Sequence, residues 1–261
     1  MPSEDAPAVT VEQVSKRYFL RGKHGTSLKT ALLTLPGLLF NGRARHEFWA
    51  LRDLSFTVRR SECLGLIGPN GSGKSSLLRI IAQITPPTEG RVTTNGRVSA
   101  LLELGAGFHE QLTGRENALL NAVLLGLRRQ EAREMLPEII AFSELGDFID
   151  QPMLTYSSGM YMRLGFAVAV HVRPEILLVD EVLAVGDAEF QSKCYTHMER
   201  LREAGVTIIM ASHDLTAIQR YTDRVLLLEQ GRIALEGKPA NVLHEYLLRV
   251  FGAKEATGTK G

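Results

Sequence analysis

The feature that most constrains this chain is a glycine-rich stretch between two apolar segments. Its residues read Gly68-Pro69-Asn70-Gly71-Ser72-Gly73-Lys74-Ser75-Ser76. The short apolar run 63–67 before it predicts a buried strand, and residues 76–81 after it have the spacing of a helix. Glycines here let backbone N–H groups wrap around a polyphosphate, and the start of the helix adds its dipole. The order strand, loop, helix therefore predicts a P-loop that binds ATP.

Two side chains of this loop have the chemistry that a nucleotide and its metal ion need. Lys74 is expected to reach the β- and γ-phosphates, and the Ser75 hydroxyl is expected to coordinate Mg²⁺. The alternative is a glycine-rich turn with an exposed lysine. The spacing of glycines, lysine and serine between a strand and a helix favours the nucleotide site.

Two further apolar runs end in polar side chains. Residues 176–179 lead to Asp180 and Glu181, and residues 206–211 lead to His213. Parallel strands end at one edge of a sheet, so we expect these side chains near the glycine-rich loop. Asp180 is expected to hold the hydration shell of Mg²⁺, Glu181 to orient or deprotonate the attacking water, and His213 to hydrogen-bond the γ-phosphate. Taken alone, each could be an incidental residue of a solvated turn.

A second predicted helix begins with small polar residues. These residues are Ser157, Ser158 and Gly159, with Ser157 as the expected N-cap. The N-terminus of a helix with this composition is a second anion site. One chain carries no second phosphate for it.

Composition and charge limit the classes of partner. Basic and acidic residues number 30 and 29, so overall charge gives no reason to expect nucleic acid. The two cysteines fit a reducing compartment. Because no run approaches the ~20 apolar residues of a membrane span, and the N-terminus lacks the apolar core of a signal peptide, we expect a cytoplasmic chain.

With these motifs in this order, almost the whole chain resembles the ATP-binding cassette (ABC) family. The resemblance implies a homodimer that sandwiches two ATP molecules, each held by the glycine-rich loop of one chain and Ser157–Gly159 of the other. Residues 184–187 match a loop that communicates across such a dimer, and His213 matches a switch histidine. Tyr18 matches the aromatic residue that stacks on adenine.

Departures from the common pattern indicate one branch of that family. Glu103 stands where the family usually has a glutamine that senses Mg²⁺, and residues 19–48 separate Tyr18 from Trp49 where most cassettes have only a few residues. The branch that this chain resembles exports bacterial cell-surface polysaccharides such as O-antigen, teichoic acid and capsule. The segments that carry this resemblance are residues 104–108, 156–160 and 180–190.

The branch implies partners and a location. It has a separate membrane-spanning permease subunit in two copies, a substrate built on a lipid diphosphate carrier, and a peripheral position at the cytoplasmic face of the inner membrane. Some members carry a C-terminal carbohydrate-binding domain; this chain ends soon after Tyr246, and we expect none here. The alternatives are a cassette for another exported cargo such as a drug or peptide, a soluble cassette acting on DNA or ribosomes, and an inactive nucleotide-binding regulator.

The predicted fold class is α/β, a P-loop NTPase of the ABC cassette type forming a single domain over residues 1–251. It comprises a RecA-like core, an antiparallel β subdomain and an inserted helical subdomain with apolar residues at helical spacing through 117–129 and 135–148. The expected bounds are about 1–102 and 172–250 for the core, about 103–171 for the helical subdomain, about 19–48 for an N-terminal insertion and 252–261 for a loose tail.

The N-terminal insertion has a pattern of its own. Residues 28–40 are apolar at helical spacing, Pro36-Gly37 interrupts them, and basic residues flank them on both sides. An apolar stripe framed by cations suits the membrane interface, the membrane partner, or the diphosphate head of a lipid-linked glycan. The alternative is a hydrophobic flap folded on the chain's own antiparallel sheet.

Overall fold

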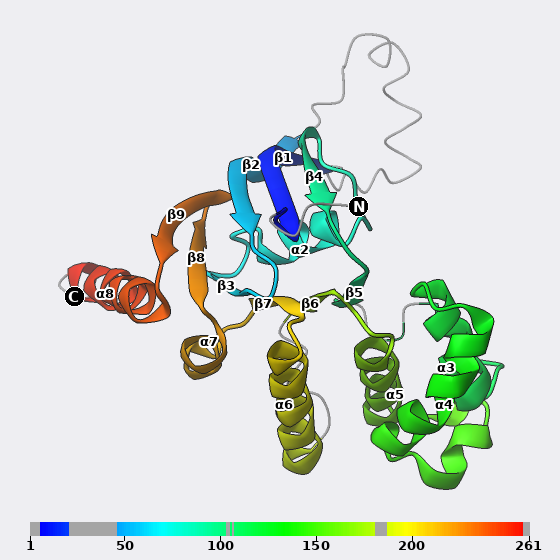
Figure 1. Ribbon diagram of the computed structural model, residues 1–261. Coiled ribbons are helices and arrows are strands. Elements are labelled where there is room, and N and C mark those ends of the chain that lie inside the picture. Colours follow the sequence, from blue (N-terminus) through cyan, green and yellow to red (C-terminus); the bar gives the residue numbers. More distant parts are fainter. Residues whose placement is uncertain (1–5, 21–45, 103–104, 106, 181–186, 258–261) are drawn as a thin grey trace, which may run out of the picture.

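The computed structural model describes residues 6–20, 46–102, 105, 107–180 and 187–257. A mixed sheet lies at the centre of the fold, with further elements packed on both of its faces (Figure 1). Helix α2 (Lys74–Ile81) lies between that sheet and a small antiparallel sheet, while α5, α6 and α7 lie on its other face. The predicted α/β class is confirmed. The described residues include no helix with the length and apolarity that crossing a bilayer requires.

The larger sheet has six described strands in the order β5-β6-β7-β3-β8-β9. Their bounds are β3 Cys63–Ile67, β5 Val98–Leu101, β6 Ile176–Asp180, β7 Thr207–Ala211, β8 Arg224–Glu229 and β9 Arg232–Gly237. Neighbouring strands pair in parallel, except that β9 runs antiparallel to β8. Every residue of β3 and β7 is buried, which explains why these strands read as continuous apolar runs.

The smaller sheet has the order β2-β1-β4 among the described residues. Its strands are β1 Val9–Leu20, β2 His46–Val58 and β4 Glu89–Thr94. Because β1 and β2 pair out to Leu20 and His46, strand takes up both ends of the predicted insertion. Residues 21–45, and with them the apolar stripe 28–40, lie outside the described residues.

Three helices pack together beside the edge strand β5 (Figure 1). They are α3 Gly114–Leu124, α4 Arg129–Ser143 and α5 Ser158–His171, with 3₁₀ turns Gly146–Asp150 and Met153–Thr155 between the last two. A capping box of Thr113 and Glu116 starts α3. Helices α3 and α4 end before the segments with apolar residues at helical spacing, 117–129 and 135–148, do. The chain adopts left-handed conformations at Gly126 (φ 100°) after α3 and at Glu144 (φ 56°) after α4, which end these helices. These helices share an apolar core that includes Ala118, Ile139 and Leu164.

The remaining helices follow the C-terminal strands. They are α6 Ala188–Glu203, α7 Leu215–Tyr221 and α8 Pro239–Thr257. Helix α8 continues through residues 252–257, where the sequence predicts a loose tail. Residues 253–256 read Ala-Lys-Glu-Ala, and these are strong helix formers.

Candidate nucleotide-binding site

The loop between β3 and α2 has a backbone that requires glycine at two positions. Gly68 has φ 142°, and a Cβ there would lie 2.1 Å from the carbonyl oxygen of Leu228. Gly73 has φ 109°, forms the N-cap of α2, and a Cβ there would lie 2.5 Å from Leu51 Cδ2. No L side chain fits either position without moving the surrounding backbone. The local sequence therefore folds into the tight loop that a phosphate cradle needs.

Lys74 is the buried cation of this loop, with 5% of its surface exposed. Its Nζ donates hydrogen bonds to the carbonyl oxygens of Gly68 at 2.8 Å and of Pro69 at 3.3 Å. The Ser72 hydroxyl is also buried and has no hydrogen-bond partner among the described residues. Burying an N–H or O–H donor costs free energy unless the donor has a hydrogen-bond acceptor. The oxygen atoms of a phosphate are such acceptors. A buried ammonium and an unpaired hydroxyl in one loop fit a polyphosphate ligand.

The strand ends bring the other predicted side chains to the same edge of the sheet. Leu66 of β3 pairs with Ala211 of β7, and Ala211 pairs with Asp180 of β6. These residues therefore form one row across the strands. Gly68 comes two residues after Leu66, just beyond the end of β3, and His213 comes two residues after Ala211, just beyond the end of β7. The expectation that these strand ends meet at one edge is confirmed.

Asp180 has the character of a metal ligand. Its Oδ1 is buried and has no hydrogen-bond partner within the described residues. A buried carboxylate oxygen without a donor is costly, and carboxylate oxygen is the ligand type that Mg²⁺ prefers. Ser75, exposed in the first turn of α2, offers a hydroxyl. This donor set fits Mg²⁺. Glu181 and Glu103 lie outside the described residues, so their roles stay predictions.

The predicted second anion site lies at the exposed start of α5. Ser157 is the N-cap, as predicted, and its hydroxyl accepts a hydrogen bond from Met160 N at 3.2 Å. Ser157 and Ser158 are exposed. Gly159 has no positive φ, and among the described residues a Cβ there would meet only Ser157 Oγ, at 3.9 Å. Nothing in the described part of this chain explains a glycine at this position.

Part of segment 104–108 packs against the same helix. The Tyr161 hydroxyl of α5 donates to Gly105 O at 2.9 Å, and Phe108 meets the Tyr161 ring edge to face at 5.1 Å. Burial raises the pKa of Tyr161, which keeps the phenol a donor. Gly105 has φ 79°, and a Cβ there would lie 2.1 Å from the tyrosine ring. This contact joins the segment after β5 to the helix that carries Ser157.

A cleft of about 970 Å³ lies beside the glycine-rich loop. Its lining includes Pro69 and Gly71 of the loop and two aromatic residues of β2, Phe48 and Trp49. Tyr18 is not among the described residues that line it; it pairs with Phe48, and Lys16 Nζ lies 5.3 Å from its ring centroid. Stacking of Tyr18 on adenine stays a prediction. No sequence motif singled out this aromatic pair on β2, although Trp49 precedes Ala50, whose carbonyl oxygen would lie 2.6 Å from a Cβ at Gly73.

Known proteins match both the sequence and this geometry. Residues 51–184 match the family described as ABC transporter, which is half of the chain. The chain belongs to the ABC transporter family.

Relatives of this ABC cassette extend over nearly its full length. The O-antigen export system ATP-binding protein RfbB of Klebsiella pneumoniae is 45% identical, over 92% of this chain and 97% of its own. The teichoic acids export ATP-binding protein TagH of Listeria innocua is 39% identical, over 91% of this chain and 69% of its own.

Solved ABC cassettes share its fold. A dimer of the ATP-binding cassette MJ0796, in a post-hydrolysis state bound to ADP and Pi, has a TM-score of 0.68 at 22% identity. The match covers 88% of this chain and 98% of that one. At this identity the likeness concerns the fold alone.

Proposed function

We propose that this chain is the ATP-hydrolysing subunit of an ABC transporter that exports a lipid-linked cell-surface polysaccharide. The observation that supports the ATPase is the row of strand ends. It brings to one edge of the sheet the buried Lys74 loop, His213, and an Asp180 oxygen that has no hydrogen-bond partner among the described residues. The names of the relatives, which refer to O-antigen and teichoic acid export, support the cargo.

The side chains divide the chemistry among them. Lys74 binds the β- and γ-phosphates, and Ser75 and Asp180 hold Mg²⁺, which when bound neutralises the charge of the phosphoryl group. Glu181 follows Asp180 directly and takes the proton of the attacking water. His213 hydrogen-bonds the γ-phosphate. Glu103 as a further Mg²⁺ contact and Tyr18 as the adenine platform complete the assignment.

The exposed start of α5 supports a homodimer with two composite sites. Ser157–Gly159 presents a capped helix N-terminus and a glycine that no described residue of its own chain requires. A phosphate held by the P-loop of a second chain fits both features. In this arrangement each ATP needs the loop of one chain and Ser157–Gly159 of the other.

The proposed transporter also includes membrane-spanning partners, and the chain itself is divided into a core and a helical subdomain. Two copies of a membrane-spanning permease subunit receive the dimer, which lies peripherally at the cytoplasmic face of the cell membrane. The separate apolar core of α3, α4 and α5 supports a helical subdomain over about 103–171, inserted into a core of about 1–102 and 172–250. The basic and apolar insertion 19–48 contacts the membrane, the permease or the diphosphate of the glycan carrier.

Removal of the gene tests the cargo. We expect loss of surface polysaccharide and accumulation of lipid-linked glycan on the cytoplasmic leaflet, with recovery by the wild-type chain but not by Glu181→Gln. A second variant replaces residues 28–40 with a Gly-Ser linker, and it should bind ATP but fail to restore export. Unchanged surface glycan together with lost export of a drug or peptide would instead support the alternative cargo.

A further inference from the structure

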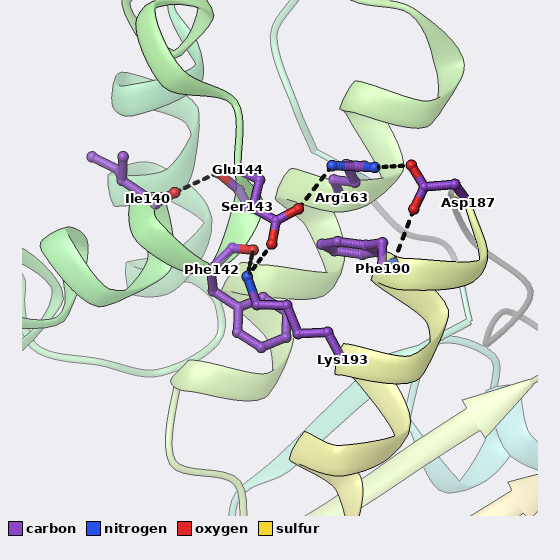
Figure 2. Close-up of polar contacts among 8 residues, drawn as sticks. All are labelled: Ile140, Phe142, Ser143, Glu144, Arg163, Asp187, Phe190 and Lys193. Atoms are coloured by element: carbon purple, nitrogen blue, oxygen red, sulfur yellow. Dashed lines mark hydrogen bonds and ion pairs between the residues drawn. The ribbon is translucent and has the colours of Figure 1, made fainter.

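Four charged side chains form an alternating chain where α4, α5 and α6 meet (Figure 2). Arg163 of α5 donates from Nη2 to Asp187 Oδ2 at 2.7 Å and from Nη1 to Glu144 Oε2 at 3.1 Å. Lys193 of α6 donates to the other oxygen of Glu144 at 2.6 Å. One guanidinium thus joins two carboxylates that come from different parts of the fold.

The two carboxylates of this charged cluster, those of Glu144 and Asp187, belong to residues at helix ends. Glu144 is the C-cap of α4, with φ 56°, and Asp187 is the N-cap of α6, where its Oδ1 accepts from Phe190 N at 2.9 Å. Arg163 therefore joins the side chain of the residue that ends α4 to the side chain of the residue that begins α6. The planar guanidinium suits this geometry because its N–H groups point to separate acceptors.

Aromatic rings pack against the two cations of this charged cluster. The Arg163 guanidinium lies 4.7 Å from the centroid of the Phe190 ring, and Lys193 Nζ lies 4.6 Å from that of Phe142. Lys193 also donates to Phe142 O at 3.0 Å. Phe142 in turn stacks on Phe166 of α5 at 5.9 Å and meets Phe190 of α6 edge to face at 5.8 Å. The three helices are therefore packed and charge-paired at one point.

The charged cluster around Arg163 lies between the two segments that the proposed ATP site uses. Helix α5 begins at the exposed Ser157 cap, and Arg163 lies in its second turn. Asp187 caps α6, the next described helix after the strand β6 that ends at Asp180. We propose that Arg163 is a positioning residue that fixes the Ser157–Gly159 end of α5 relative to the acidic strand end, so that the composite ATP sites of a dimer close correctly. This inference rests on the proposed function.

Exposure separates this role from simple stabilisation. Asp187 and Glu144 have 65% and 42% of their side chains exposed, and Arg163 has 20%. Ion pairs this open to solvent add little to stability. A misplacement of about 1 Å in a catalytic site, by contrast, costs up to roughly a hundredfold in rate. Loss of the bridge should therefore reduce turnover much more than it reduces the melting temperature.

The test compares Arg163→Gln with Arg115→Gln in the purified full-length chain. Arg115 of α3 makes a bidentate pair with Asp150, but that pair stays among the helical elements and does not reach α6. We expect Arg163→Gln to lower kcat about tenfold or more, with the Kd for ATP within about twofold of wild type. Its melting temperature should stay close to that of Arg115→Gln, whose kcat should match wild type.

Asp187→Asn guards against a folding artefact. Its remaining amide oxygen can still cap α6, so only the ion pair is removed. It should lower kcat as Arg163→Gln does, and the double variant should be no worse than Arg163→Gln alone, because both remove one interaction.

Wild-type kcat in Arg163→Gln or Asp187→Asn, or an equal loss in Arg115→Gln, would overturn the inference while leaving the ATPase intact. A wild-type chain without ATP hydrolysis would instead overturn the proposed function, and the inference with it.

Discussion

The glycine-rich loop and the start of α5 both offer backbone N–H groups and hydroxyls to an anion, but the chain builds them in opposite ways. At Gly68 and Gly73 its own backbone and side chains leave no room for a Cβ, and Lys74 is buried. At Gly159 a Cβ would meet no described atom closer than Ser157 Oγ, at 3.9 Å, and the neighbouring serines are exposed. The glycine-rich loop is therefore a phosphate half-site that one chain shapes by itself, and the start of α5 is the second half-site. The composition of the second makes sense when a second chain covers it.

The largest expected effect concerns the half-site of the glycine-rich loop. Glu181→Gln removes the proton acceptor but leaves the Lys74 loop and Asp180 in place. We expect ATP binding within about twofold of wild type and hydrolysis slower by roughly a hundredfold or more, because general-base catalysis contributes on that scale. ATP should then trap a dimer in size-exclusion chromatography. Wild-type turnover in this variant would remove Glu181 from the mechanism.

A pair of glycine variants tests the comparison itself. Gly73→Ala places a Cβ against Leu51 in a left-handed backbone, and we expect it to lower the free energy of unfolding by about 1–3 kcal/mol. Gly159→Asp adds an anion near a helix N-terminus, so stability should hold or rise by about 0.5 kcal/mol. The same anion should repel phosphate and abolish hydrolysis. Denaturant unfolding and ATPase rates measure both quantities.

If Gly159→Asp destabilised the chain as strongly as Gly73→Ala, the open character of the α5 start would be refuted. If it kept wild-type hydrolysis, Ser157–Gly159 would not face a phosphate.

The smallest effect concerns two neighbouring histidines, His171 of α5 and His197 of α6, whose ring centroids lie 4.9 Å apart. Burial lowers the pKa of His197 to about 4, with the neighbouring His171 adding to the shift, and burial also lowers the pKa of His171. Because the folded chain resists protonating His197, this residue supports stability above pH 6.5, and the support is lost as the pH falls from 6.5 towards 4. The side chain is partly exposed, so the loss should be only about 1–2 kcal/mol. Between these pH values His197→Gln should show a flatter dependence of unfolding free energy than wild type.

Local patterns explain how much of the fold could be predicted. The loop, the strand before it and the acidic strand end each have a short sequence signature, and the parallel register then places them together. The helix ends could not be predicted in the same way. Apolar residues continue at helical spacing beyond α3 and α4, whereas the helices themselves end where Gly126 and Glu144 adopt left-handed conformations.

Contacts between distant elements were the part that sequence could not reveal. Arg163 bridges helix ends at Glu144 and Asp187, and no spacing rule links exposed charges so far apart in sequence. Phe48 and Trp49 were missed for a related reason. The family pattern directs attention to an aromatic residue on β1, while the lining of the cleft beside the loop depends on how β2 packs against it.

Mixing two inactive variants tests the composite site most directly. A Lys74→Ala chain lacks the phosphate cation, and a Gly159→Asp chain lacks a usable α5 start, so each alone should hydrolyse almost no ATP. A mixed dimer contains one site in which the loop of the Gly159→Asp chain faces the intact Ser157–Gly159 of the Lys74→Ala chain. We expect an equimolar mixture to recover up to about a quarter of the wild-type rate, the share of intact sites under random pairing. A mixture no faster than the sum of its two components would contradict the composite site.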